Sequence, residues 1–104
     1  IQGLILPVNK KDRNHIYHLY TIRITEDYHI TRNELFKKLS KNGIGSSVQY
    51  VPIHLMSLYK KEYQGKMNSF PNTNKIKNQV LSLPIFPTMS IKQVEKVVSV
   101  ISKN

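Results

Sequence analysis

The chain has 104 residues and a net charge of +10, from sixteen lysine and arginine residues against six aspartate and glutamate residues. This length fits one domain with one hydrophobic core, and no apolar run approaches the roughly 20 residues that a helix needs to span a bilayer. The sequence has no cysteine, which excludes a disulfide framework, a thiolate nucleophile and a cysteine-based zinc site. These properties predict a single domain over residues 1–104, located in the cytoplasm.

The first part of the chain predicts extended structure. Residues 1–8 are expected to form a short extended segment, and the polar residues 9–14 a loop. The next run is rich in isoleucine, tyrosine and threonine, which suit a pleated and half-buried surface. We therefore predict a strand from Ile16 to Ile24. Its alternation places one set of side chains toward the core: Ile16, His18, Tyr20, Ile22 and Ile24.

A helix is predicted after this strand. Thr31 and Glu34 have the spacing of a capping box, in which each side chain accepts a hydrogen bond from the other residue's amide. The helix is expected from about Arg32 to Asn42, with an apolar stripe of Leu35, Phe36 and Leu39. Gly43 suits the left-handed conformation that commonly follows a helix.

The middle of the chain is less regular. A second strand is predicted over Ser46 to Val51, ended by Pro52, because proline has no amide to donate. Residues 53–65 are expected to be irregular or loosely helical, and residues 66–69 a polar link. A helix from about Asn72 to Val80 follows, and then a third short strand over Leu81 to Pro84.

The end of the chain predicts another helix. Ser90 and Gln93 again have capping-box spacing. An apolar stripe continues to the end of the chain: Ile91, Val94, Val98 and Ile101. The order of elements predicts an α+β fold, with a small, mainly antiparallel sheet of about three strands and helices on one face.

Few residues suggest chemistry. His15 and His18 fall on opposite faces of the predicted strand, so a shared metal is not expected. The carboxylates form no evident acid-base pair. The remaining candidates are Gln49, Tyr50 and His54, which lie around a rigid proline turn. They suit hydrogen bonding to a polyhydroxylated ligand, and they equally suit a surface glutamine, a core tyrosine and a histidine that caps a turn.

Two further properties leave alternatives open. The charge of +10 is compatible with a basic module that binds nucleic acid, although only three of the basic residues are arginine and the lysines are scattered. The chain begins at Ile1 with an apolar run, which is unusual for a free terminus. We therefore expect a domain of a longer protein, or a non-functional gene fragment.

An ordered series of short motifs over about residues 15–101 resembles the C-terminal domain of the DegT/DnrJ/EryC1/StrS aminotransferases. No single block is decisive, but the combination is specific. The series is Tyr17-His18-Leu19-Tyr20, Arg32-x-x-Leu35-x-x-x-Leu39-x-x-x-Gly43-Ile44, Val48-Gln49-Tyr50-x-Pro52-x-His54-Leu55, Phe70-Pro71-Asn72, Leu81-Ser82-Leu83-Pro84-Ile85-Phe86-Pro87 and Val94-x-x-Val97-Val98.

The resemblance implies the C-terminal small domain of an aminotransferase of fold type I, which uses pyridoxal 5'-phosphate. Such enzymes transfer an amino group from glutamate to a nucleotide-linked keto-sugar, for polysaccharide and related pathways, and are typically homodimers. The match implies substrate contacts at Tyr50 and His54, with Gln49 beside them. It implies neither a nucleic-acid nor a membrane partner.

Two departures from the family pattern qualify this expectation. Gln49 stands where the family commonly has histidine, and glutamine cannot carry a proton at neutral pH. The family's Schiff-base lysine and phosphate-binding loop belong to an upstream large domain, and no lysine of this chain occupies that motif. We therefore predict that the chain alone holds no cofactor and has no catalytic residue for amino transfer.

Overall fold

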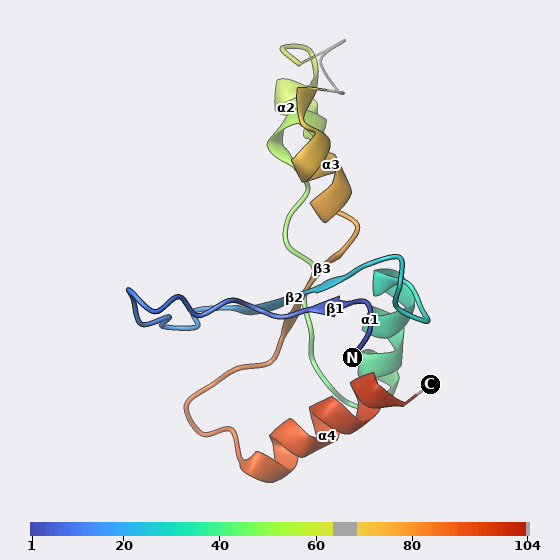
Figure 1. Cartoon of the computed structure of the whole chain (residues 1–104). Coiled ribbons are helices and arrows are strands. Elements are labelled where there is room, and N and C mark those ends of the chain that lie inside the picture. The colour runs from blue at the N-terminus through green and yellow to red at the C-terminus, as the bar shows by residue number, and fades with distance from the viewer. Residues whose placement is uncertain (64–68, 104) are drawn as a thin grey trace.

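The computed structural model describes residues 1–63 and 69–103. It consists of a body, residues 1–49 and 79–103, and an arm, residues 50–63 and 69–78, which projects away from the sheet (Figure 1). The radius of gyration is 15.9 Å, against about 13 Å for a compact domain of this length. The projecting arm and the long loop before the second strand account for this difference.

The body contains a three-stranded antiparallel sheet in the order β1-β2-β3. Its strands are β1 (Leu4–Ile5), β2 (Tyr20–Ile24) and β3 (Val80–Leu83). Leu4 pairs with Ile24 on one side of β2, and Tyr20 pairs with Leu83 on the other. The predicted mainly antiparallel sheet of three strands is confirmed, and β1 lies in the segment 1–8 that was predicted to be extended.

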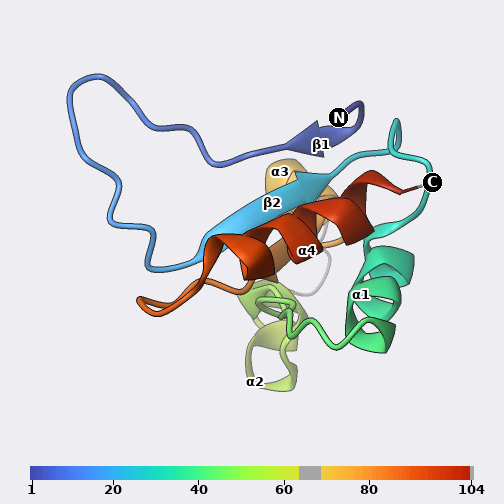
Figure 2. The same ribbon diagram turned by 90° about the horizontal axis from the view of Figure 1, so that it is seen from below.

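Helices α1 (Arg32–Lys41) and α4 (Ile91–Ser102) complete the body. Figure 2 shows α4 running across β2, with α1 beside its C-terminal end. The core between these layers is formed by Ile22, Ile24, Tyr28, Leu35, Leu39, Ile44, Leu81, Val97, Val100 and Ile101. The phenol of Tyr28 donates a 2.6 Å hydrogen bond to the carbonyl oxygen of Ile101 and so ties α4 to the loop before α1. The α+β fold is therefore as predicted.

Both predicted capping boxes are present. The Thr31 amide donates to Glu34 Oε2 at 2.8 Å, and the Ser90 amide donates to Gln93 Oε1 at 2.8 Å. Gly43 has a φ of 70°, in the left-handed region predicted for a residue that follows the helix. These local rules correctly place both helices of the body.

The strand predicted from Ile16 begins only at Tyr20. Tyr20 pairs with Leu83, the last residue of β3, and Pro84 follows with no amide to extend the ladder. Ile16 is therefore 88% exposed, and His18 is also exposed instead of facing the core. The alternating pattern was correct only over the part of the run that has a partner strand.

The strand predicted over Ser46 to Val51 does not form. Only Ser47 makes a bridge, through two backbone hydrogen bonds with Ser82. Val48 is 43% exposed and Tyr50 is 77% exposed, so the face that these two side chains would share on a strand is not buried. Alternation alone does not stabilise a strand without a buried face.

The arm contains the 3-10 turn η1 (Ile53–Leu55) and the helices α2 (Ser57–Lys60) and α3 (Pro71–Ile76). The helix predicted over 72–80 is therefore too long, because Val80 already belongs to β3. The loosely helical character predicted for 53–65 is confirmed up to residue 63. Residues 64 and 65, and most of the predicted link over 66–69, lie outside the described residues.

The predicted stripe on the last helix is only partly buried. Ile101 is buried, together with Val97 and Val100, whereas Val94 and Val98 are 41% and 52% exposed. None of the described helices combines the length and apolar composition needed to cross a membrane.

Candidate functional site

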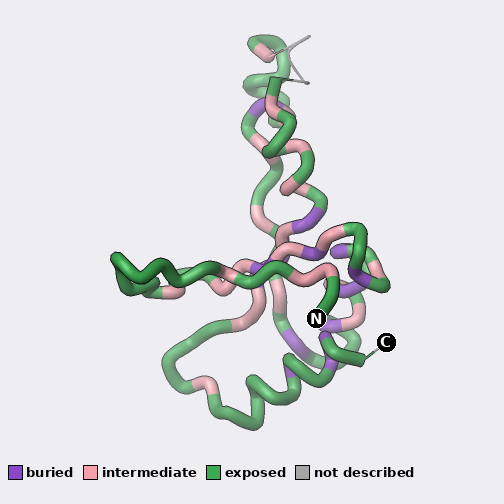
Figure 3. The backbone as a smooth tube through the Cα atoms, viewed as in Figure 1, coloured by how far each residue is buried: buried purple, intermediate pink, exposed green. Residues whose placement is uncertain are grey.

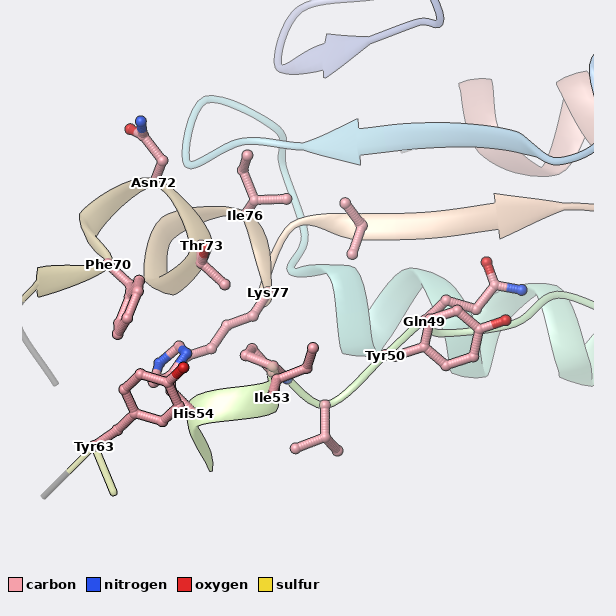
Figure 4. Close-up of a pocket in the computed structure, with 13 residues that line it drawn as sticks. Gln49, Tyr50, Ile53, His54, Tyr63, Phe70, Asn72, Thr73, Ile76 and Lys77 are labelled. Carbon is pink, nitrogen blue, oxygen red and sulfur yellow. The ribbon is translucent and has the colours of Figure 1, made fainter. Parts of the chain in front are cut away.

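A cleft of about 610 Å³ lies where the arm meets the body. One wall is the segment from Gln49 to His54, and the other is formed by α3 and the turn that follows it (Figure 4). The lining residues are Gln49, Tyr50, Val51, Pro52, Ile53, His54, Tyr63, Phe70, Asn72, Thr73, Ile76, Lys77 and Val80. All three predicted site residues therefore line one cleft, although Gln49 and Tyr50 lie at one end and His54 at the other.

Gln49 is held against the sheet by two hydroxyl groups. The Ser82 hydroxyl donates to Gln49 Oε1 at 2.8 Å, and Gln49 Nε2 donates to Ser47 Oγ at 3.2 Å. Ser82 belongs to β3 and is itself within 3.0 Å of the Thr21 hydroxyl. These contacts leave the Gln49 amide one further donor and one further acceptor position for a ligand.

Tyr50 is the exposed aromatic residue of the cleft. It is 77% exposed, so it is not the core tyrosine that the sequence left as one alternative. Its ring lies beside Gln49. An exposed ring of this kind offers an apolar face with a polar tip to a bound molecule.

His54 is buried, with 5% of its surface exposed. Its Nε2 lies 3.1 Å from Asn74 Oδ1, and its ring stacks on Phe70 with centroids 4.8 Å apart. The ring of Tyr63 packs edge-on against the ring of Phe70, with the two centroids 5.5 Å apart. These contacts join η1 to α3, so His54 holds the two walls of the cleft together.

Arg32 fixes the turn between α3 and β3. Its side chain is 9% exposed, and its two terminal nitrogens donate to the carbonyl oxygens of Val80 at 3.2 Å and Lys77 at 3.3 Å. Burial lowers the pKa of the Arg32 guanidinium. No carboxylate of the described chain forms an ion pair with it, since the one ion pair there joins Asp12 and Arg13.

Sequence reasoning did not identify the contributions of Asn74, Lys77 and Arg32 to this cleft. Arg32 was interpreted as the first residue of a helix and as the start of one motif of the series, and the other two as part of a longer helix. The pairing of His54 with Asn74 spans twenty positions, and no local pattern announces such a contact. The Phe70-Pro71-Asn72 block marked the correct region, because α3 begins there.

A second cavity, of about 450 Å³, lies between the sheet and α4. Its described lining is apolar except for Tyr20, and includes Leu4, Leu83, Val94 and Val98. This cavity explains the partial exposure of Val94 and Val98, but it lacks the convergent polar groups that mark a binding site for a small polar ligand.

Comparison with known proteins identifies relatives over nearly the whole chain. The profile of the DegT/DnrJ/EryC1/StrS aminotransferase family matches residues 1–102. The spore coat polysaccharide biosynthesis protein SpsC of Bacillus subtilis is 35% identical over 97% of this chain and 26% of its own length. The dTDP-3-amino-3,6-dideoxy-alpha-D-galactopyranose transaminase of Aneurinibacillus thermoaerophilus is 32% identical over 94% of this chain and 25% of its own.

The fold is also similar to that of a solved aminotransferase structure. The crystal structure of S. venezuelae DesV in complex with a ketimine intermediate is similar to the chain with a TM-score of 0.82 and 34% identity. The match covers 95% of this chain and 25% of DesV, so the chain spans about a quarter of the length of its relatives. The fold is accordingly that of a small domain of an aminotransferase. The chain belongs to the DegT/DnrJ/EryC1/StrS aminotransferase family.

Proposed function

We propose that the chain is the C-terminal small domain of a larger aminotransferase that transfers an amino group from glutamate to a nucleotide-linked keto-sugar. Membership of the family carries this proposal. The substrate class is supported by the name of the Aneurinibacillus relative, a transaminase of a dTDP-linked sugar. In full-length form we expect a cytoplasmic homodimer.

The cleft at the base of the arm is the part of this chain that we assign to the sugar. The Tyr50 ring offers an apolar face for the C–H groups of a pyranose, and Gln49 offers hydrogen bonds to a hydroxyl. His54 also lines the cleft, while its hydrogen bond to Asn74 holds η1 to α3. In this arrangement the residues bind and orient the sugar, and none of them performs the amino transfer.

The cofactor implied by the family is pyridoxal 5'-phosphate, which acts as the electron sink of amino transfer when it is bound. The described cleft does not fit it. The lining includes one lysine, Lys77, but neither an aspartate nor a glutamate to pair with the pyridine nitrogen. We therefore assign the cofactor, and the lysine that binds it covalently, to the part of the enzyme outside this chain.

Activity assays on the longer protein encoded by the whole reading frame test this proposal. The purified protein is incubated with glutamate and with dTDP- and UDP-linked keto-sugars, and the amino-sugar product is detected by mass spectrometry. We expect product from the longer protein and none from the 104-residue chain alone. Amino transfer by the isolated chain, or its absence from the longer protein with every keto-sugar offered, would contradict the proposal.

Variants of the cleft test where the sugar lies. Tyr50→Ala is expected to raise the KM for the nucleotide sugar about 3- to 10-fold, the range of an aromatic contact. Tyr59→Ala in α2 is the matched control, because Tyr59 does not line the cleft. Gln49→His restores the residue common in the family and is expected to change the rate or the sugar preference. If neither variant differs from the wild type, the sugar does not lie against this segment.

A further inference from the structure

We propose that Lys77 recognises the phosphate groups of the nucleotide-sugar. This inference rests on the proposed function and adds a specificity-determining residue to it. Lys77 lies in the turn directly after α3, at the wall of the cleft opposite Ile53 and Pro52. Figure 4 shows its side chain extending across the cleft toward His54 and Tyr63.

The charge distribution of the cleft is the first reason. Lys77 is the one lysine or arginine that lines the described cleft, and the lining includes no carboxylate. The single ion pair of the described chain lies elsewhere, between Asp12 and Arg13. The Lys77 ammonium therefore faces a partly apolar cleft without an acidic partner of its own, which favours an anionic ligand.

The backbone at Lys77 is held in place, which is the second reason. Its amide donates to the carbonyl oxygen of Thr73 at 3.0 Å, and its carbonyl oxygen accepts from the buried guanidinium of Arg32 at 3.3 Å. The Cα of Lys77 is therefore fixed, while the flexible aliphatic part of its side chain lets the ammonium adjust its position to a ligand. The charge of Arg32 behind the turn adds to the positive potential on the same side.

The size and composition of the cleft favour a phosphate of the sugar substrate over the carboxylates of glutamate. A volume of about 610 Å³ is large for an amino acid and lies within the ordinary range for a substrate of nucleotide-sugar size. Thr73 and Asn72, on the same wall, offer neutral hydrogen bonds to further oxygens. A lysine suits a phosphate because its ammonium is a compact charge with three donors.

Three variants of the full-length enzyme test the inference: Lys77→Gln removes the charge, Lys77→Arg keeps it, and Lys75→Gln is the matched control. Lys75 belongs to α3 but is exposed and does not line the cleft. Lys77→Gln is expected to raise the KM for the nucleotide-sugar about tenfold with little change in kcat, as for the loss of a charge-assisted hydrogen bond. Lys77→Arg should stay within about threefold of the wild type, and Lys75→Gln should match it.

Calorimetric binding of dTDP, UDP and inorganic pyrophosphate gives a readout that does not need the reaction. We expect the dissociation constant of the nucleoside diphosphate that binds most tightly to rise about tenfold in Lys77→Gln and to remain near the wild-type value in Lys75→Gln. Higher salt should weaken wild-type binding more than binding by Lys77→Gln, because the variant has lost one charge.

The outcomes separate this inference from the proposed function. If diphosphate binding depends on Lys77 but the protein transfers no amino group, the role of Lys77 is supported and the proposed amino-transfer function is wrong. If Lys77→Gln transfers the amino group normally and with an unchanged KM, the role of Lys77 is wrong and the proposed amino-transfer function stands. A rise in the KM for glutamate alone, or no binding of any of the three diphosphates by the wild type, would also overturn the inference.

Discussion

The body and the arm are held together by different forces. The largest fully buried side chains, Ile22, Leu35, Leu39 and Leu81, all belong to the body. In the arm, His54 is the one buried residue among the described positions 50–63 and 69–78 (Figure 3). The body therefore depends on apolar burial, whereas the arm depends on a histidine-asparagine hydrogen bond and stacked rings. The cleft lies at the base of the arm, where the well-packed body meets a region with few buried side chains.

Removing a core side chain from the body is expected to have the largest effect. Leu39→Ala, at a position with no exposed surface, should lower the free energy of unfolding by about 2–5 kcal/mol because it leaves a cavity. Leu58→Ala in α2 is the control, since Leu58 is 80% exposed, and it should change stability by less than about 0.5 kcal/mol. Urea denaturation followed by circular dichroism measures both. If the two variants lower the free energy of unfolding equally, the body does not depend on apolar burial more than the arm does.

Breaking the histidine contacts should affect the arm alone. His54→Ala removes the hydrogen bond to Asn74 and the stack on Phe70. We expect the local opening free energy at the amides of Leu55 and Met56 to fall by about 1–3 kcal/mol. Native-state hydrogen exchange measures this opening, with Ile24 in β2 as the internal reference for the body.

The control for the arm is His18→Ala, because His18 is an exposed histidine of the body. It should leave exchange at Leu55 and Met56 unchanged. If His54→Ala instead accelerates exchange at Ile24 as strongly as in the arm, body and arm unfold as one cooperative unit.

The same difference explains how much of the fold could be predicted from the sequence. Apolar periodicity and capping signals correctly placed α1 and α4, because these helices bury a stripe against the sheet. The strand predicted over 46–51 and the helix predicted over 72–80 were wrong in extent or in kind. Both lie in or beside the arm, where few side chains are buried and periodicity therefore carries little information.

The sequence likewise predicted part of the candidate site and missed the rest. Residue type around the proline turn selected Gln49, Tyr50 and His54, and the motif resemblance implied substrate contacts at the last two. All three line the cleft. Neither signal predicted that His54 is buried against Asn74 and Phe70, because that contact joins segments that have no shared local pattern. Residue type and spacing can propose which side chains meet a ligand, but the packing of distant segments decides which of them also support the walls.

Weakening the contact between body and arm should have an intermediate effect. Arg32→Lys keeps the positive charge but loses the fork that reaches the carbonyl oxygens of both Val80 and Lys77. We expect a loss of about 1–2 kcal/mol in the free energy of unfolding, together with faster hydrogen exchange at Lys77. Arg23→Lys is a control, because Arg23 contacts the Gln79 side chain within the body. Equal exchange at Lys77 in both variants would show that Arg32 does not link the two regions.

Acid is expected to have the smallest effect, through the carboxylate that caps a helix of the body. Hydrogen bonds from the Thr31 hydroxyl and amide, with the nearby charge of Lys37, lower the pKa of Glu34 in the folded chain. The stability that Glu34 contributes is therefore present above its unfolded pKa of about 4.3 and is lost as the pH falls through the lower folded value. The arm helices α2 and α3 have no side-chain cap to lose.

The two capping boxes of the body supply their own control for this effect. The α4 box uses Gln93, which does not titrate, in the place that Glu34 occupies in the α1 box. Glu34→Gln should therefore flatten the fall in urea midpoint between pH 5 and pH 3, which brackets the carboxylate range. Gln93→Glu should steepen it, because the same carboxylate then caps the second helix. If Glu34→Gln leaves the pH dependence unchanged, the α1 cap does not contribute to acid sensitivity, and other carboxylates of the chain account for it.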